Sequence, residues 1–227
     1  MLSVIIPALN AGQVLGPTLD AVSAARRFLP CETIVVDGGS TDDSVQVATR
    51  HGAIVLDSPR GRGVQLAAGA AAAAGDWFFF LHADTRPQDG WIPALRKFIN
   101  APDSQRRAAV LRFRLDDRAL AARLVERAVA IRTGLFRLPY GDQGLLIGRA
   151  FYEELGGYAR IPLMEDVDIV RRIGRSRLSV LNAAGLTSAE RYRRDGYLLR
   201  PLRNLVCLAL YKAGVSPRTI SSLYHSH

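Results

Sequence analysis

The sequence predicts an α/β protein with three layers, α/β/α, and a mostly parallel central sheet. The chain has 227 residues, of which 48% are hydrophobic and 22% are charged, a balance typical of a globular protein with a sizeable core. In residues 1–100, short apolar runs alternate with segments of helical periodicity. Within these runs consecutive residues are apolar, as expected for parallel strands that are covered on both faces.

The order of elements is clearest in residues 1–100. Strands are expected at 2–9, 32–37, 53–56 and 77–81, where β-branched and aromatic residues cluster. Helices are expected at 14–28, from about 40 to 50, at 64–74 and at 91–99, where apolar spacing is helical. Ser40 and the acids after it supply a cap and first-turn negative charge to the second helix.

Residues 101–227 are less regular. Residues 110–115 alternate, with Leu111 and Phe113 on one face and Arg112 and Arg114 on the other, which predicts a half-buried strand that is reversed and antiparallel. Helices are expected at 119–133, 149–155, 166–173 and 196–213, and strands at 144–148 and 178–181. Neither a repeat nor a linker interrupts the pattern, so we expect one domain over residues 1–227.

The net charge points to an anionic partner. It is +9, and nearly all of it comes from arginine, because Lys97 and Lys212 are the only lysines. Arginine suits bidentate binding of phosphate and carboxylate, so a nucleoside diphosphate, an anionic lipid or a nucleic acid would fit. GC-rich codon usage accounts for the same bias equally well.

The compartment is predicted from the cysteines and the N-terminus. Cys31 and Cys207 lie in apolar runs, which indicates buried thiols in a reducing environment. The first residues lack the basic segment and cleavage site of a signal peptide, and no apolar run approaches the roughly 18 residues that span a bilayer. We therefore expect a cytoplasmic protein that is not integral to a membrane.

Polar groups follow each of the four early strands. Asn10 follows the first, Asp37 the second, Arg62 the third, and His82 and Asp84 the fourth. Ligands of parallel sheets collect where the strands end at their carboxyl edge. These side chains are therefore expected to gather at one edge of the sheet.

Asp37 is followed by two glycines and Ser40. Its carboxylate could accept hydrogen bonds from a ribose or a base, while Gly38 and Gly39 permit close backbone approach. The alternative is an Asp turn in which Ser40 caps the next helix.

His82 and Asp84 occupy alternate positions, so both could reach one divalent cation from the same face of an extended chain. A cation there would stabilise the charge on a departing diphosphate. The alternatives are a buried imidazole in a supporting role for His82 and a cap for Asp84.

Three acids stand at the start of a predicted helix, at Glu165, Asp166 and Asp168. Acids complement the positive end of a helix dipole, which would be sufficient reason for their presence. The alternative is that one carboxylate acts as a general base toward a hydroxyl.

Together these segments resemble the family 2 glycosyltransferases, which have the GT-A fold. The resemblance spans about residues 2–175 and follows the family's order. It is carried by Ser3–Asn10, Ile34–Asp42, Gly61–Gly63, Phe80–Asp84, Gly156–Tyr158 and Glu165–Asp166. The finer pattern of Leu-His-Ala-Asp-Thr and Gly-Asp-Gln-Gly resembles a small bacterial subgroup, the selenodomain-associated transferases.

The resemblance implies an inverting transfer of a sugar from a UDP- or GDP-linked donor, assisted by Mn²⁺ or Mg²⁺. It implies a nucleotide-binding half at 1–100, an acceptor and catalytic half at 101–185, and a C-terminal amphipathic helix within 186–227. Asp166 and Glu165 would form the catalytic pair. The nucleotide would contact Pro7, Ala8, Asn10, Asp37, Gly39, Arg62, Ala83 and Asp84, and the metal would contact Asp84 and His82.

Two departures from the family pattern affect this expectation. Gly38 replaces an acid and weakens the expected ribose contact, and His82 replaces the first acid of the metal motif. If His82 binds the metal, Mn²⁺ gains over Mg²⁺, because imidazole suits the softer ion.

The remaining assignments stay open between two or three interpretations. Asp142 and Gln143 could line an acceptor pocket or form a plain turn, and Arg191 and Arg193 could bind a phosphate or begin a solvated helix. The helix at 196–213 could pack on the domain, form a homodimer, or lie on the inner face of a membrane and meet a lipid-linked acceptor.

Two other functions would also use an anion-binding α/β protein. A nucleotidyltransferase would carry a basic glycine-rich loop after the first strand, but no basic residue precedes Arg26. A non-catalytic nucleic-acid-binding protein would place aromatic residues among its basic ones and leaves the acids at the strand and helix ends without a role. We therefore expect no nucleic-acid partner.

Overall fold

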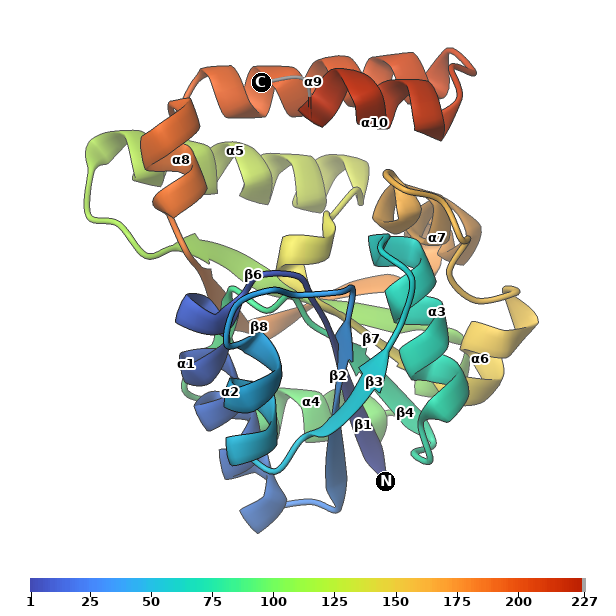
Figure 1. Cartoon of the computed structure of the whole chain (residues 1–227). Helices are drawn as coiled ribbons and strands as arrows, with labels where there is room; N and C mark the ends of the chain where they lie inside the picture. The colour runs from blue at the N-terminus through green and yellow to red at the C-terminus, as the bar shows by residue number, and fades with distance from the viewer. Residues whose placement is uncertain (226–227) are drawn as a thin grey trace.

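An eight-stranded sheet forms the centre of the protein in a computed structural model, which describes residues 1–225 (Figure 1). The strand order is β3-β2-β1-β4-β7-β6-β8-β5. The strands are β1 (Leu2–Ala8), β2 (Cys31–Asp37), β3 (Ile54–Asp57), β4 (Trp77–Phe80), β5 (Thr85–Pro87), β6 (Ala108–Leu115), β7 (Leu145–Gly148) and β8 (Leu178–Thr187). Only β5 and β7 run against the other six strands, so the prediction of a mostly parallel sheet is confirmed.

Helices cover both faces of the sheet because the buried strands are apolar at consecutive positions. Val4 and Phe79 point to one face, which α1 (Gly12–Ser23), α2 (Ser44–Arg50) and α4 (Trp91–Ile99) cover. Ile5, Phe78 and Phe80 point to the other face, which α3 (Arg62–Ala72), α6 (Arg149–Glu154) and α7 (Glu165–Ile173) cover. The three-layer prediction is therefore confirmed. Successive side chains of each strand point to opposite faces, so each strand contributes residues to both hydrophobic cores.

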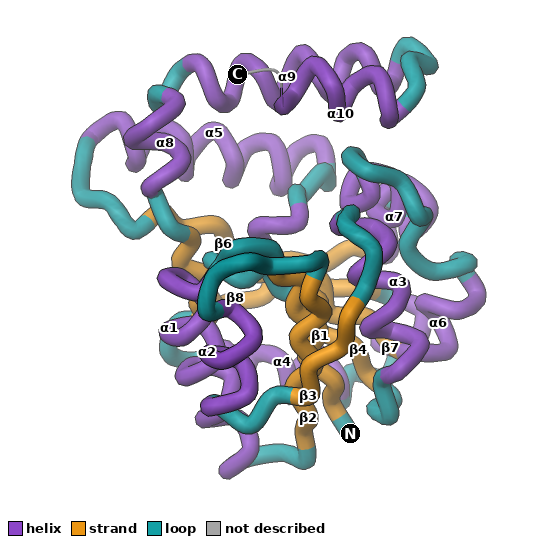
Figure 2. The backbone as a smooth tube through the Cα atoms, viewed as in Figure 1, coloured by secondary structure: helices purple, strands orange, loops and turns teal. Residues whose placement is uncertain are grey.

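A further group of helices lies beyond the carboxyl edge of the early strands (Figure 2). It comprises α5 (Leu120–Phe136), α8 (Glu190–Asp195), α9 (Leu199–Lys212) and α10 (Pro217–His225). Phe113 and Leu115 of β6 pack against α5 and Tyr192 of α8, while Cys207 of α9 and Ile220 of α10 pack against Leu163. None of the helices that the structure describes combines the length and the apolarity that crossing a bilayer requires.

Several boundaries differ from the predictions for physical reasons. Gly196 has a φ of +87° and ends α8, so the helix expected at 196–213 begins only at Leu199, as α9. The strand expected to be reversed, β6, runs with the early strands, because β7 is the reversed strand and pairs antiparallel with both β4 and β6. The sequence analysis missed β5, α8 and α10, which are short or weakly apolar. Four 3₁₀ turns lie at Ala24–Arg27, Ser104–Arg106, Gly141–Gln143 and Arg175–Arg177.

The predicted thiols are both shielded, but to different degrees. Cys207 is buried and Cys31 is half-buried, and both are free. Burial raises the pKa of each thiol, while nearby arginines oppose the shift.

Candidate active site at the carboxyl edge of the sheet

The loops after β1 and β2 are joined into one unit. Asn10 adopts a left-handed conformation with a φ of +49°, and its Oδ1 accepts a hydrogen bond from the Thr41 N–H at 2.9 Å. The Asn10 N–H in turn donates to Ser40 Oγ at 2.9 Å. The Gly12 N–H donates to Asp42 Oδ2 at 2.9 Å. These bonds hold Asn10 beside the segment that follows Asp37.

Asp37 ends β2 and is buried, with 5% of its surface exposed. Its Oδ2 accepts hydrogen bonds from the Gly39 N–H at 2.9 Å and the Ser40 N–H at 2.8 Å. Ser40 Oγ donates to Oδ1 of the same carboxylate. The Asp turn weighed as an alternative is thus present, and it fixes the loop on which the nucleotide is expected to bind. Ser40 does not cap the next helix as expected, because α2 begins at Ser44 with Asp43 before it.

Gln65 explains why Gly38 departs from the family pattern. Its Nε2 donates to the carbonyl oxygens of Ala8 and Val36, each at 2.8 Å, and so connects the ends of β1 and β2. A Cβ atom at position 38 would lie 3.0 Å from that same nitrogen. The sequence analysis missed Gln65, because nothing in the spacing of the sequence marks its amide as a bridge between strands.

Arg62 connects two parts of the site. It lies in the first turn of α3, and its Nε is 2.8 Å from Oε1 of Glu165, at the start of α7. Glu165 is 1% exposed, and its Oε2 is buried without a hydrogen-bond partner. Burial raises the pKa of Glu165 to about 7, with Asp166 adding to the shift and Arg62 opposing it. The ion pair therefore joins α3 to α7 through a carboxylate that titrates near neutral pH.

His82 is held as a neutral acceptor. Burial lowers its pKa well below the usual value, and the positive charges of Arg62 and Arg191 lower it further. Nε2 lies 3.2 Å from Arg62 Nη1, and since a guanidinium can only donate, Nε2 accepts the hydrogen bond. A Cβ atom at Gly141 would lie 2.5 Å from Nε2, so the loop also covers this side of the ring. The lone pair of His82 Nε2, which a metal ion would need, therefore already accepts the hydrogen bond from Arg62.

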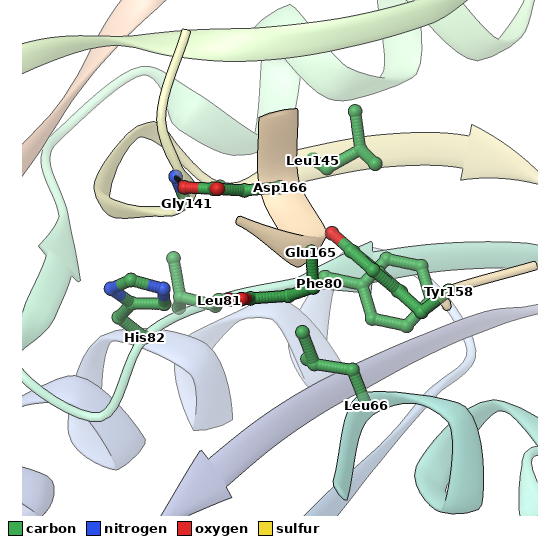
Figure 3. A pocket seen from close by; sticks show the side chains of 10 residues that line it. Leu66, Phe80, Leu81, His82, Gly141, Leu145, Tyr158, Glu165 and Asp166 are labelled. Carbon is green, nitrogen blue, oxygen red and sulfur yellow. Dashed lines mark hydrogen bonds between the residues drawn. The ribbon is translucent and has the colours of Figure 1, made fainter. Parts of the chain in front are cut away.

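Asp166 faces a small pocket that His82, Glu165 and Tyr158 also line (Figure 3). Its Oδ2 accepts a hydrogen bond from the Gly141 N–H at 2.8 Å, and its Oδ1 accepts one from the Val167 N–H at 2.7 Å. The carboxylate is thereby held in one orientation. The pocket lies between the start of α7, the end of β4 and the loop that contains Gly141.

Asp142, which was expected either to line an acceptor pocket or to form a plain turn, lies among the other charged residues of the site. Its Oδ1 is buried without a hydrogen-bond partner, and its carbonyl oxygen accepts a hydrogen bond from Thr187 Oγ1 at 3.4 Å. Burial raises its pKa to about 6, and the negative charges of Asp166 and Asp84 add to the increase. The carboxylates of Asp84 and Asp166 therefore lie close enough for their charge to act on Asp142 at this edge of the sheet.

These carboxylates fit a divalent cation that is shared with a ligand. An unpartnered, buried carboxylate oxygen among like charges is stabilised by a cation. Among the described residues, no three His, Cys, Asp or Glu side chains form a ready-made metal cluster. Mg²⁺ in nucleotide sites is commonly held by one or two carboxylates together with substrate phosphates. Asp84 and Asp142 are the residues that would hold such an ion here.

The other predicted residues divide into those near the site and those away from it. Ala8 and Ala83 contribute backbone, with their carbonyl oxygens accepting bonds from Gln65 and from Thr18. Gln143 is 1% exposed, and its side chain anchors the loop that contains Gly141 to β6 by donating to the Leu111 carbonyl oxygen at 3.0 Å. Pro7 is half-buried beside Ala8 in β1, and Gly39 has a φ of +87° with open space around it.

The two predicted arginines are also separated. Arg191 is exposed and lies close enough for its charge to lower the pKa of His82. Arg193 is instead paired with Asp117 at 2.7 Å, beside α5. The structure thus brings together Arg62, His82, Asp84, Asp142, Glu165, Asp166 and Arg191, with Asp37 farther along the same edge on β2.

The chain is similar in sequence to known glycosyltransferases. Residues 3–130, more than half of the chain, match the family described as glycosyl transferase family 2. The chain is 39% identical over 94 residues to an uncharacterised glycosyltransferase of Mycobacterium tuberculosis, a segment that covers 41% of each protein. It is 33% identical over 104 residues to the glucosyl-3-phosphoglycerate synthase of Mycolicibacterium paratuberculosis, which covers 41% of this chain and 32% of that one. The matches thus span about two fifths or less of these relatives.

The fold has counterparts among solved structures. Glucosyl-3-phosphoglycerate synthase from Mycobacterium tuberculosis, in complex with Mn²⁺ and UDP-glucose, superposes with a TM-score of 0.59 at 23% identity, over 83% of this chain and 69% of that one. The same enzyme with Mg²⁺ and UDP gives the same TM-score. The likeness identifies the fold as GT-A, as the sequence resemblance predicted. With its family match and its fold in agreement, the chain belongs to glycosyl transferase family 2.

Proposed function

We propose that the protein transfers a sugar from a nucleoside diphosphate to an acceptor hydroxyl with inversion at the anomeric carbon. The observation that carries this proposal is the fixed carboxylate of Asp166, which faces a pocket beside Asp84 and Asp142. A general base must be held at the reacting hydroxyl, and two backbone N–H groups hold this one. The family membership favours this activity over a nucleotidyltransferase or a nucleic-acid-binding protein.

The proposed reaction is a direct displacement. Asp166 accepts the proton of the acceptor hydroxyl while the hydroxyl oxygen bonds to the anomeric carbon. The bond between that carbon and the diphosphate oxygen breaks on the opposite side, and the diphosphate leaves with the electron pair. Arg62 and Arg191 place positive charge next to His82, at the edge where the diphosphate is expected.

We propose a UDP-linked donor and a divalent cation, Mn²⁺ or Mg²⁺, rather than the GDP-linked alternative. Structures of a protein with the same fold contain UDP-glucose with Mn²⁺, and UDP with Mg²⁺. When bound, the cation would stabilise the negative charge of the departing diphosphate. The pocket is small in the present conformation, so a donor sugar would enter it only if the start of α3, which carries Arg62, and the loop that carries Gly141 separate.

The test replaces the proposed base and its neighbour on the same helix. Asp166→Asn should reduce transfer and donor hydrolysis by a factor of about 10² to 10⁴, because the amide cannot take the proton. UDP binding, measured by calorimetry with Mn²⁺, should persist. Nucleotide sugars are screened first for slow hydrolysis by the unaltered protein.

The matched control is Asp168→Asn, which makes the same change in α7 at a carboxylate that pairs with Arg172. It should leave turnover close to that of the unaltered chain. Near-normal turnover in the Asp166→Asn variant would remove this residue from the role of base, and an absence of UDP binding by the unaltered protein would overturn the donor assignment.

A further inference from the structure

Two neighbouring helices expose large apolar side chains that nothing in the structure covers. Of the fourteen large hydrophobic residues that are exposed among those whose burial the structure describes, eleven lie on or next to α5, α9 and α10. On or beside α5 they are Leu120, Leu124, Ile131, Leu135 and Phe136, and on or beside α9 they are Leu198, Leu199, Leu202, Leu205 and Val206, with Leu223 on α10. Leu120 is 84% exposed and Leu198 is 85% exposed.

Helical spacing places these residues, except Phe136 at the end of α5, on one face of each helix. In α5, positions 120, 124, 131 and 135 fall within one narrow stripe, while Val125 and Val129 face the core. In α9 the exposed leucines lie opposite the buried Cys207 and Leu208. Both helices therefore pack through one side and present a second apolar side outward.

The segments that lead into the two helices are joined to each other. The Tyr197 hydroxyl, just before α9, donates to Asp117 Oδ2 at 2.6 Å, just before α5. Arg193 of α8 pairs with the same carboxylate. Both helices lie at the end of the molecule opposite the N-terminus (Figures 1 and 2). We call the exposed residues of α5 and α9 the apolar surface.

The exposed charges on these helices have one sign. The exposed basic residues of α5, α9 and α10 are Arg127, Lys212 and Arg218, while Arg200 and Arg203 pair with Asp195 of α8 and Arg123 pairs with Glu126. The only acid on the described part of these helices is Glu126, which is 6% exposed and paired with Arg114 and Arg123. By helical spacing, Arg127 and Lys212 fall among the exposed apolar residues.

We propose that the apolar surface binds an anionic lipid bilayer, with α5 and α9 lying in the plane of the interface. Leucine stripes with basic neighbours and no exposed acids are typical of interfacial helices. Anionic lipid complements this charge, whereas a second copy of the chain would bring two basic faces together. Exposed patches of this kind are uncommon on a protein without a partner.

The same surface is connected to the candidate active site. The α9–α10 pair packs on Leu163 and Met164, which immediately precede Glu165. The chain leaving α5 reaches Gly141, whose N–H holds Asp166, within five residues. The acceptor would therefore be a hydroxyl of a lipid-anchored molecule in that bilayer, a part of the inference that rests on the proposed transferase function.

The experiment is co-sedimentation of the whole chain with vesicles. Vesicles of phosphatidylglycerol and phosphatidylcholine in equal parts should bind the protein, and phosphatidylcholine alone should bind it much less. Binding should weaken as salt is added, because salt screens the attraction between Arg or Lys and anionic lipid. Leu202→Glu/Leu205→Glu and Leu124→Glu/Ile131→Glu should each weaken binding by roughly a hundredfold or more.

The matched control is Phe28→Glu/Ile54→Glu, which makes the same change in charge at exposed apolar residues elsewhere, 61% and 48% exposed. It should bind vesicles nearly as well as the unaltered chain. Thermal melting checks that each variant is folded. If Leu202→Glu/Leu205→Glu is not folded, Leu202→Ser/Leu205→Ser takes its place. Asp166→Asn should bind vesicles normally, so failure of the transferase proposal and failure of this one give different results.

Three outcomes would overturn the inference. The unaltered protein could fail to bind the anionic vesicles, or the control pair could lose binding as much as the two surface pairs. Sedimentation without lipid could also show a dimer that the surface pairs dissociate, which would assign the apolar surface to a second copy of the chain.

Discussion

The raised pKa of Asp142 shows that negative charge is concentrated at the candidate site. Its unpartnered Oδ1 lies close to two other carboxylates, and its pKa is raised to about 6. The folded protein therefore binds this proton more tightly than the unfolded chain does. The contribution to the free energy of unfolding is complete at low pH and decreases as the pH rises through the interval from 3.8 to about 6.

Replacement of Asp142 should therefore stabilise the protein where the carboxylate is ionised. Asp142→Asn should raise the free energy of unfolding by about 1–3 kcal/mol near pH 8 and change it little near pH 4. Urea unfolding at the two pH values measures this, with the exposed Asp116→Asn as control. Added Mn²⁺ and UDP should raise the melting temperature of the unaltered chain more than that of the variant, and an equal rise would remove Asp142 from the cation site.

A second prediction concerns the Arg62–Glu165 pair. Arg62→Ala should destabilise the protein by about 1–3 kcal/mol near pH 8, because it leaves an ionised carboxylate buried. The loss should be smaller near pH 5, where Glu165, with a pKa of about 7, is protonated. The double variant Arg62→Ala/Glu165→Gln should recover most of the loss near pH 8. Equal destabilisation at both pH values would show that packing, and not charge, dominates.

The sequence predicted the types of residue at the site better than their pairing. His82 and Asp84 were placed by their spacing at a strand end, and Asp166 by its position before a helix. The bond from Arg62 to Glu165 joins residues that are far apart in the chain, and no local pattern encodes it. Likewise the alternation in 110–115 gave the buried face of β6, but its direction depends on the insertion of β7 between β4 and β6.

At the level of elements, α3 lies unusually close to the sheet. Gly69 faces β1, and a Cβ atom there would lie 2.4 Å from Ile5 Cγ2 and 2.9 Å from Val36 Cγ2. The alanine-rich composition of residues 64–74 is consistent with this approach, because larger residues would hold the helix away. The close packing brings Gln65 within reach of two strands and Arg62 over the site.

This packing predicts the effect of a small substitution. Gly69→Ala should lower the free energy of unfolding by about 1–3 kcal/mol, since the methyl group overlaps two buried side chains. Gly134→Ala in α5, where a Cβ atom has no neighbour within 4 Å, should instead stabilise the protein by about 0.5–1 kcal/mol. Urea unfolding of both variants measures the difference, and equal values would contradict close contact of α3 with the sheet.

For the whole molecule, the proposed donor and acceptor halves share one sheet. β4 pairs with β7, and β5 pairs with β8, so strands from residues 1–100 lie against strands from residues 101–187. This continuity is consistent with a single domain with two sides, in which 1–100 is proposed to bind the nucleotide and 101–185 to contribute the base. The sequence also predicted an amphipathic C-terminal helix, but not that α5 would expose a second apolar stripe beside it, because neighbouring helices are set by tertiary packing.

α10 contacts the segment that immediately precedes α7, the helix that carries Asp166. Ile220 is fully buried against Leu163, and the next residue, Met164, has a φ of +69° that the surrounding packing must maintain. α10 therefore supports, through Leu163, the segment that leads into α7 and its Asp166. Removal of α10 would loosen the start of α7 without altering any residue of the candidate active site.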